Sequence, residues 1–464
     1  MGPRLPVDLQ EPLDELVRPT TRFAHDLTFP PPDRIRVYDD TLRDGEQMPG
    51  VALAPRAKYE LARVLSEIGV HIMDVGFPAV SASERETLRL VLEGRRRGEL
   101  RPDLEVLCMM RCDPRDVDAT FRVLDELGYP RDEVTYFVFT SASDLHLKYK
   151  LGRTLLAREG IPASEWLEMP VAFYREANLR LLCDAIRYAR SEGAGLIEFG
   201  GEDGSRADLE YVKLLHQEGL AAGGDRPSTP DTVGCYSPYA AAASIREIKE
   251  ATPDAPLVVH FHNDLGLGAW NTVVALGSGA EVFTTSVNGI GERTGNAPMH
   301  QVLLQLRYLF GIDIPGFRYD RLRELAHLLE RMSGIPVQPT EPGIGRNVFS
   351  HESGIHTAGM LIHPAIYQFI PPADLGGEVH YVYGKHSGAL VIEHALRQSG
   401  VEPEPSLVSR VTEEVKKLRE ERAERSDFGD FQHAYEDHLE GMGVSAAEVA
   451  EIARALQTEV DGGR

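Results

Sequence analysis

Residues 258–266 read Val258-Val259-His260-Phe261-His262-Asn263-Asp264-Leu265-Gly266, a β-branched and aromatic run that ends in a turn containing glycine. Side chains alternate between the two faces of a strand, so His260 and His262 point the same way and Phe261 points the other way. Two imidazoles on one buried face are costly, and binding of a divalent metal ion is the usual reason for them. A pair of hydrogen-bonded core histidines is the alternative that this stretch alone leaves open.

A second segment favours the metal interpretation. Residues 38–47, Tyr38-Asp39-Asp40-Thr41-Leu42-Arg43-Asp44-Gly45-Glu46-Gln47, also follow an apolar run and end in charged residues and glycine. One carboxylate from this segment would complete a set of two histidines and one carboxylate, with open positions for the oxygens of a substrate.

The two segments belong to a repeating pattern of a short apolar run, a loop and an amphipathic helix. The predicted strands are 35–40, 71–77, 104–109, 133–140, 195–200, 227–233, 257–262 and 281–287, and the predicted helices are 55–68, 83–97, 114–127, 171–192, 206–221, 237–252, 267–279 and 298–309. Eight strands alternating with eight helices predict an α/β fold, the (β/α)8 TIM barrel. A doubly wound open sheet is the alternative, but Asp44-Gly45-Glu46-Gln47 is not the Gly-rich phosphate loop that such sheets often carry. The sixth strand is the weakest of these predictions, because Pro227 and Pro230 lie within it.

Most of the unusual polar residues follow the predicted strands. In TIM barrels the chemistry takes place at the carboxyl ends of the strands. Each residue alone has a structural interpretation: Glu202 and Asp203 could cap the next helix, Arg206 could pair with them, and His146 could be a solvated loop residue. Together they predict an active site on one rim of the barrel, formed by Arg43, Asp44, Arg111, His146, Glu198, Glu202, Thr232, His260 and His262.

The sequence outside this pattern divides into further segments. Residues 1–33 are polar and Pro-rich and predict an irregular amino-terminal arm, which precedes the barrel domain at 34–312. Residues 313–395 begin with a predicted helix at 317–335 and continue as irregular chain that suits a linker or lid. This segment contains His351-Glu352-Ser353-Gly354-Ile355-His356 and Gly384-Lys385-His386-Ser387-Gly388. Residues 396–464 predict a helical carboxyl-terminal subdomain, with helices near 405–424, 429–440 and 445–457.

Composition narrows the function classes. The net charge of −23 argues against nucleic acid or an anionic membrane as the main partner. The amino terminus does not resemble a signal peptide, and no apolar run approaches the length of a membrane helix. The four cysteines include no CxxC pair and suit a reducing compartment, so a cytoplasmic location is expected.

Several motifs occur together in a recognisable order. They are Asp40-Thr41-Leu42-Arg43-Asp44-Gly45-Glu46-Gln47, Gly76-Phe77-Pro78-Ala79, Asp231-Thr232-Val233-Gly234, His260-Phe261-His262-Asn263-Asp264, Asn288-Gly289-Ile290-Gly291-Glu292-Arg293 with Gly295-Asn296, and His351-Glu352-Ser353-Gly354-Ile355-His356. In this combination the chain resembles the 2-isopropylmalate synthase and homocitrate synthase family from about residue 35 to residue 388.

The resemblance implies a Claisen-type condensation of acetyl-CoA with a 2-oxo acid, followed by thioester hydrolysis to CoA and a 2-substituted malate. It implies a divalent ion, Mg, Mn or Zn, on Asp44, His260 and His262, with Asn296 in or near the coordination shell. It also implies a homodimer that exchanges its carboxyl-terminal segment, so that His356 acts from the partner subunit. The catalytic residues expected on this basis are Arg43, His356 and Glu202, and the substrate-binding residues are Arg43, Thr232, His146, Arg111 and Glu198.

The resemblance leaves the 2-oxo acid open. Some homocitrate synthases carry arginine at the position of Glu198, so this chain does not match that branch. Arg111 is either an anchor for a second acidic group or a framework residue. Gly200-Gly201 replace a stretch that is often Ser-rich, which removes bulk from the wall facing the side chain of the 2-oxo acid. The helical carboxyl-terminal region predicts no leucine-binding regulatory domain. The alternatives are condensation with a phosphono- or phosphino-2-oxo acid, or a lyase resembling hydroxymethylglutaryl-CoA lyase.

Overall fold

The strand that contains His260 is one of eight parallel strands that close into a barrel. The computed structural model describes residues 27–425 and 428–462. The strands follow one another around the ring in chain order: β1 (Arg36–Asp39), β2 (Ile72–Asp74), β3 (Glu105–Arg111), β4 (Thr135–Ser141), β5 (Ile197–Glu202), β6 (Arg226–Asp231), β7 (Val258–Phe261) and β8 (Val282–Thr285). Pairing of β1 with β8, which places Tyr38 opposite Thr284, closes the ring. The predicted (β/α)8 fold is confirmed.

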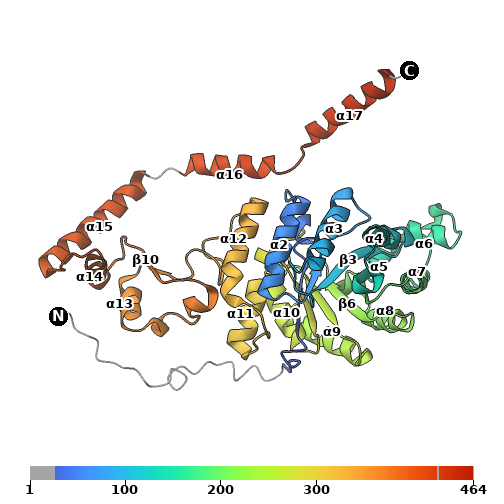
Figure 1. Ribbon diagram of the computed structural model, residues 1–464, viewed down its shortest axis with the longest axis horizontal. Coiled ribbons are helices and arrows are strands. Elements are labelled where there is room, and N and C mark those ends of the chain that lie inside the picture. The colour runs from blue at the N-terminus through green and yellow to red at the C-terminus, as the bar shows by residue number, and fades with distance from the viewer. Residues whose placement is uncertain (1–26, 426–427, 463–464) are drawn as a thin grey trace. The chain divides into compact units, whose positions relative to one another are not determined.

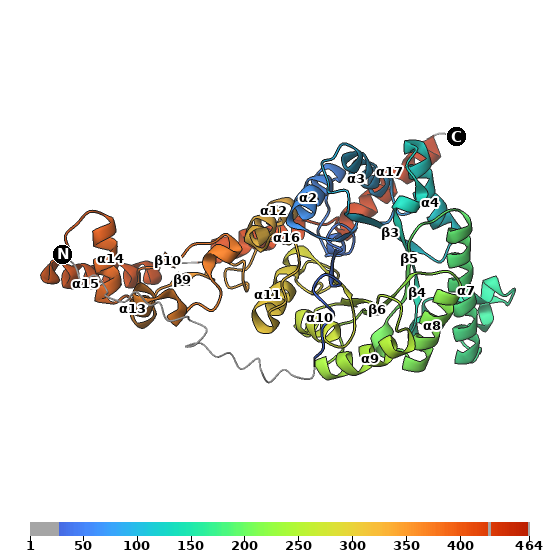
Figure 2. The same cartoon turned by 60° about the horizontal axis from the view of Figure 1, so that its bottom comes forward.

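Helices surround this ring, as Figures 1 and 2 show. Each predicted helix is present: α2 (Pro55–Ile68), α3 (Ala82–Arg96), α4 (Pro114–Leu127), α7 (Val171–Ser191), α8 (Leu209–Ala221), α9 (Pro238–Ala251), α10 (Gly268–Leu276) and α11 (Met299–Phe310). Buried Leu61, Leu65 and Ile68 give α2 its apolar stripe. Gly69 ends that helix in the left-handed conformation, with φ of 110°.

Several element boundaries in the barrel differ from the prediction, and one connection contains helices that were not predicted. Helix α8 begins at Leu209 rather than at 206, because the carboxylate of Asp208 caps it by accepting hydrogen bonds from the backbone N–H groups of Glu210 and Tyr211. Between β4 and α7 the chain forms two short helices that were not predicted, α5 (Asp144–Tyr149) and α6 (Gly152–Arg158). Strand β6 pairs with both of its neighbours in spite of its prolines.

The lower interior of the barrel combines an apolar layer with a buried ion-pair network. Tyr38, Ile72, Leu107, Val258 and Val282 form a core cluster. Near the amino ends of the strands, the guanidinium of Arg226 donates to Glu198 at 2.8 Å and to Glu105 at 2.6 Å. The upper interior, toward the carboxyl ends, contains the cavity described below.

A buried lysine connects two loops at the carboxyl end of the barrel. Lys58 on α2 is fully buried, and its Nζ lies 2.5 Å from a carboxylate oxygen of Glu46 and 2.5 Å from one of Glu84. Glu46 lies in the loop after β1, and Glu84 accepts a hydrogen bond from the backbone N–H of Phe77 after β2. One ammonium group therefore holds together the loops that precede α2 and α3.

Replacing Lys58 by methionine is expected to destabilise the protein by about 3–5 kcal/mol, because two carboxylates would lose their shared cation. Urea unfolding followed by circular dichroism measures this change. Lys213→Met is the matched control: Lys213 pairs with Glu210 and Glu247 at the surface of α8, and its loss should leave the unfolding midpoint unchanged. Equal midpoints for the Lys58 variant and the wild type would contradict the prediction.

The chain divides into two compact units. The first contains the barrel and α12 (Leu322–Ser333), and the second consists of residues 48–52, 349–369 and 379–464. The second unit contains the short strands β9 (Ser350–His351) and β10 (His380–Tyr381), and helices α13 (Gly354–Ile362), α14 (Ala389–Gln398), α15 (Pro405–Arg425), α16 (Gly429–Gly441) and α17 (Ala446–Gly462).

The prediction of irregular chain up to residue 395 is wrong at α13 and α14. Helix α13 contains Gly354 and Gly359 and no Asp, Glu, Lys or Arg, so it lacks the polar and apolar periodicity that identifies a helix. Of the predicted amino-terminal arm, residues 1–26 lie outside the described residues. Within the described chain, no helix combines the length and the hydrophobicity needed to cross a membrane.

Candidate active site

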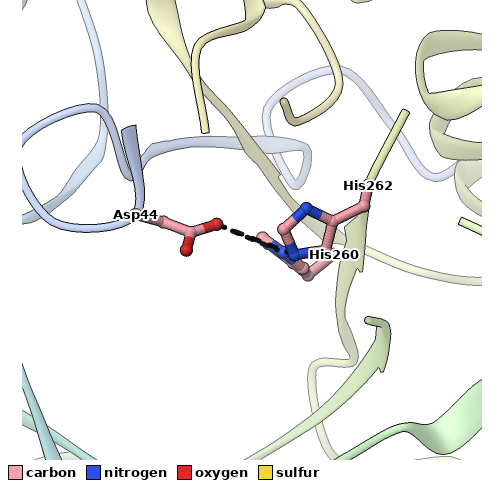
Figure 3. Close-up of side chains that lie close together, drawn as sticks. All are labelled: Asp44, His260 and His262. Carbon is pink, nitrogen blue, oxygen red and sulfur yellow. Dashed lines mark ion pairs between the residues drawn. The ribbon is translucent and has the colours of Figure 1, made fainter. Parts of the chain in front are cut away.

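Three side chains from β7 and the loop after β1 converge at the carboxyl end of the barrel. Oδ2 of Asp44 lies 3.6 Å from Nε2 of His260 and 3.9 Å from Nε2 of His262 (Figure 3). Among the described residues, these three form the one group of three or more His, Cys, Asp or Glu side chains that could hold a metal ion. Their possible ligand atoms all lie within 4.8 Å of one another. Their side chains are only 5%, 12% and 7% exposed, respectively. Two imidazoles and one carboxylate at this spacing fit a divalent metal ion.

Hydrogen-bonding groups fix the orientation of His260. Its Nδ1 lies 2.6 Å from Oγ1 of Thr284 and 3.2 Å from Oδ2 of Asp40, which is fully buried. The ring therefore presents Nε2 to Asp44. A carboxylate behind a histidine in this way fixes the tautomer and raises the basicity of a metal ligand.

Asn296 lies beside these residues in the loop after β8. Its backbone forms an isolated bridge with His262, and its amide Nδ2 donates to Asp44 at 2.7 Å and to Asp40 at 3.2 Å. Its Oδ1 is buried and has no hydrogen-bond partner within the described structure. Asn296 would offer Oδ1 to an ion only after its amide group turns over, so the present geometry places it as a neighbour of Asp44.

Arg43 extends the site on the side of Asp44. Its Nη1 lies 3.1 Å from Oδ1 of Asp44, and its Nε donates to Oδ2 of Asp74 at 2.7 Å. Asp74 ends β2 and is fully buried. Two carboxylates therefore hold one guanidinium in place next to the candidate metal site, where it can donate to an oxygen that gains negative charge.

Burial and neighbouring charges shift the pKa values of these groups. Burial acts to raise the pKa of Asp44, but Arg43 and the two histidines outweigh it and lower this pKa to about 2. Burial and neighbouring His260 lower the pKa of His262 to about 4. For Asp74, burial outweighs Arg43 and raises the pKa to about 6. At neutral pH an ionised Asp44 and a neutral His262 are therefore favoured, which are the protonation states that metal ligands require.

These residues open into a cavity of about 290 Å³. Arg43, Asp44, His260 and His262 line one part of it, together with Thr232 and Arg293. The remaining walls come mainly from the inner faces of β3 to β6 and from the loop after β2, and include Phe77, Met109, Phe137, Phe139, Glu198, Gly200, Glu202, Ser228 and Pro230. A volume of about 300 Å³ is at the lower end of the range for small-molecule sites.

Two more of the predicted residues, Glu202 and Thr232, line this cavity. Glu202 at the end of β5 pairs with Lys150, and its side chain is 28% exposed. Oγ1 of Thr232 accepts a hydrogen bond from the backbone N–H of Asp203 at 2.8 Å. Because a hydroxyl group also carries one donor, Thr232 can donate to an oxygen of a molecule in the cavity.

His146, Arg111 and Glu198 have different positions. His146 on α5 is not among the cavity-lining residues, and its Nε2 lies 3.6 Å from the buried carboxylate of Asp203. Arg111 is also outside the lining and binds both carboxylate oxygens of Asp116, at 2.7 and 2.9 Å, so its geometry favours the framework alternative. Glu198 lines the cavity but lies near the amino end of β5, away from the rim on which it was predicted.

Sequence reasoning did not assign Asp40, Asp74 and Thr284 to the site. Asp40 follows β1, and Asp74 ends β2, so their places at strand ends were a usable signal. Their roles depend on contacts with residues far away in the chain, namely His260 and Arg43, which spacing alone does not reveal.

Comparison with known proteins adds an independent finding. A family model described as HMGL-like matches residues 34–328, more than half of the chain. The chain belongs to the HMGL-like family.

Relatives within the HMGL-like family cover most of the chain. The "Homocitrate synthase AksA" of Methanopyrus kandleri is 38% identical over 388 residues, which make up 83% of this chain and 88% of the relative. The "Probable 2-isopropylmalate synthase" of Ignicoccus hospitalis is 38% identical over 387 residues, with the same coverage. The resemblance to homocitrate and 2-isopropylmalate synthases that was predicted from the motifs is thereby confirmed.

A second model, described as homocitrate synthase post-HMGL domain-like, matches residues 344–423 of this HMGL-like chain. This region contains His356 on α13, in the second unit. The imidazole of His356 is exposed and stacks on the ring of Tyr367, with 4.1 Å between ring centroids. The ring of Tyr367, at the end of the turn that follows α13, therefore covers one face of the imidazole.

Proposed function

We propose that this protein is an acyltransferase that condenses acetyl-CoA with a 2-oxo acid in a metal-dependent Claisen-type reaction. The products are CoA and a 2-substituted malate. The observation that carries the proposal is the convergence of Asp44, His260 and His262 beside Arg43 at one cavity. The names of the relatives, homocitrate synthase and 2-isopropylmalate synthase, support it.

Asp44, His260 and His262 would hold the divalent ion, Mg, Mn or Zn. Asn296 would add its Oδ1 as a further ligand only if its amide group turned over, because Nδ2 is the atom that faces Asp44. When bound, the ion would take the carboxylate and ketone oxygens of the 2-oxo acid and polarise the ketone. Thr232 would donate its hydroxyl hydrogen to the substrate carboxylate. Arg43, held by Asp44 and Asp74, would stabilise the alkoxide that forms when the enolate of acetyl-CoA attacks the ketone carbon.

A base must first remove a proton from the methyl group of acetyl-CoA. We assign this step to His356 with help from Glu202, because histidine is the side chain used most often as a general base and Glu202 lines the cavity. The proposal includes a homodimer in which His356 comes from the partner subunit. Hydrolysis of the condensed thioester follows: the oxygen of water bonds to the acyl carbon, the carbon–sulfur bond breaks, and CoA leaves as the protonated thiol.

The experiment that tests the proposed function is an assay of CoA release. Full-length protein with Mn²⁺ and acetyl-CoA is mixed with individual 2-oxo acids, and the free thiol is measured with a chromogenic disulfide reagent. The expected result is thiol release that depends on both the 2-oxo acid and the metal ion, with a 2-substituted malate identified by mass spectrometry. Cleavage of a hydroxyacyl-CoA without condensation of any 2-oxo acid would overturn the proposal and establish a lyase.

A further inference from the structure

The deep part of the cavity is shaped by residues at matching levels of neighbouring strands. Phe137 on β4 pairs with Glu198 on β5, and one level higher Phe139 pairs with Gly200. Gly200 in turn pairs with Ser228 on β6. A Cβ atom at position 200 would lie 2.4 Å from the backbone oxygen of Ser228, so only glycine fits there. Gly200, Ser228 and Glu198 all line the cavity, so this part of its wall combines two small residues with a buried carboxyl group.

The neighbouring wall of the cavity, formed by β3, β4 and the loop after β2, is apolar and incompletely covered. Phe77, Met109, Phe137 and Phe139 are each partly exposed, although the interior of a TIM barrel is normally a packed core. The rings of Phe77 and Phe139, and those of Phe137 and Phe139, have centroids 6.3 Å apart. Apolar side chains left uncovered inside a cavity favour an apolar ligand, and tilted rings at this spacing can accept another ring.

The charges in the cavity are distributed unevenly. Among the described residues that line it, the arginines are Arg43 and Arg293, and carboxylates already bind both: Asp44 and Asp74 bind Arg43, and Asp264 binds Arg293. Both belong to loops at the metal-binding end.

At the deep end the charged lining residue is Glu198, whose side chain is 1% exposed. Oε2 of fully buried Glu198 accepts from Arg226, a guanidinium shared with Glu105, whereas Oε1 of Glu198 has no hydrogen-bond partner within the described chain. Burial outweighs Arg226 and raises the pKa of Glu198 to about 7. A second carboxylate beside this desolvated group would disfavour the ionised form of both groups, which makes their contact unfavourable.

We propose that this cavity selects a 2-oxo acid with a bulky, uncharged side chain, up to the size of an aromatic ring. It would discriminate against pyruvate, whose methyl group leaves the aromatic wall uncovered. It would also discriminate against dicarboxylates such as 2-oxoglutarate, whose second carboxylate would meet Glu198. This inference rests on the proposed function, because it names the substrate class of the same site.

The test measures binding without acetyl-CoA, so that it does not depend on the condensation. Isothermal titration of the full-length protein with Mn²⁺ compares phenylpyruvate, pyruvate and 2-oxoglutarate. The expected result is a Kd for phenylpyruvate at least about tenfold below the other two, in line with the discrimination that a few apolar contacts provide. Equal or tighter binding of 2-oxoglutarate or pyruvate would overturn the inference.

Measuring CoA release with the same three acids separates the two proposals. Tight binding of phenylpyruvate without CoA release from any acid would overturn the proposed function and support the selectivity. CoA release that is fastest with pyruvate or 2-oxoglutarate would support the function and overturn the selectivity.

Two variants test the residues that carry the argument. Glu198→Gln keeps the shape of the side chain and is expected to tighten binding of 2-oxoglutarate about tenfold, because a like-charge contact is removed. Glu105→Gln is its matched control, since Glu105 binds the same guanidinium but does not line the cavity, and the order of the three affinities should stay as in the wild type. Ser228→Leu fills the space and should weaken binding of phenylpyruvate about tenfold while binding of pyruvate stays the same. An unchanged affinity of the Glu198 variant for 2-oxoglutarate would contradict the role of Glu198.

Discussion

His262→Ala is expected to abolish CoA release and to remove the bound divalent ion. The variant retains one imidazole and one carboxylate, which are too few to hold an ion at a site with open positions for substrate. An ion supplies several kcal/mol of charge stabilisation in the transition state, so kcat/KM should fall on the order of a thousandfold. Metal content after dialysis, measured by atomic emission, gives a readout that is independent of activity.

The matched control for this variant is His327→Ala. His327 on α12 pairs with Glu330, and its side chain is 40% exposed. The His327→Ala protein should retain the metal content and the kcat of the wild type. Added Mn²⁺ should raise the melting temperature of the wild type and of His327→Ala but not that of His262→Ala, because an ion that binds the folded state stabilises it. A His262→Ala protein that keeps a full equivalent of metal would show that the ion binds elsewhere.

Arg43→Lys is expected to lower kcat about 10²–10³-fold, the usual effect of removing one donor to a developing oxyanion. Lysine keeps the charge but loses the planar fork with which Arg43 binds Asp74 and Asp44 simultaneously. The metal content should be unchanged, since Asp44, His260 and His262 are intact. Steady-state kinetics with the preferred 2-oxo acid measures the effect.

Arg111→Lys is the control for the arginine variant. Arg111 binds Asp116, and its side chain is 62% exposed, so its kcat should remain close to that of the wild type. A large loss of kcat in Arg111→Lys, or a near-normal kcat in Arg43→Lys, would mean that the roles of the two arginines are reversed.

The sequence predicted the barrel because each strand carries its own local signal. Runs such as residues 257–262 are rich in β-branched residues, and amphipathic helices separate them. Helix α13 carried no such signal, since its nine residues include two glycines and no Asp, Glu, Lys or Arg. Helices α5 and α6 were missed because they are too short to show a helical period.

The sequence predicted some residues of the candidate site correctly and missed the role or the location of others. Asp44, His260 and His262 were found because their residue types are those of metal ligands, because the two histidines share one face of a predicted strand, and because Asp44 follows another. The bond of Asp40 to His260 and that of Asp74 to Arg43 join different strands, so they depend on how the barrel closes. Glu198 was expected at the rim, but its position as the second residue of β5 puts it deep in the interior, beside Arg226.

The residues proposed to bind the metal ion and those proposed to contact the substrate side chain occupy different arcs of the ring. The proposed ion site uses β7 and the loops after β1 and β8, whereas the wall is formed mainly by β3 to β6. After a gene duplication, mutations on the arc of β3 to β6 could therefore adapt one copy to 2-oxo acids with a different chain length or ring substituent. The residues of the other arc, and the reaction they support, would stay unchanged. Protein engineers could use the same separation. Variant libraries restricted to Met109, Phe137, Phe139 and Ser228 would change which substrate side chains fit, while the residues proposed to bind the ion and to catalyse the reaction stay the same.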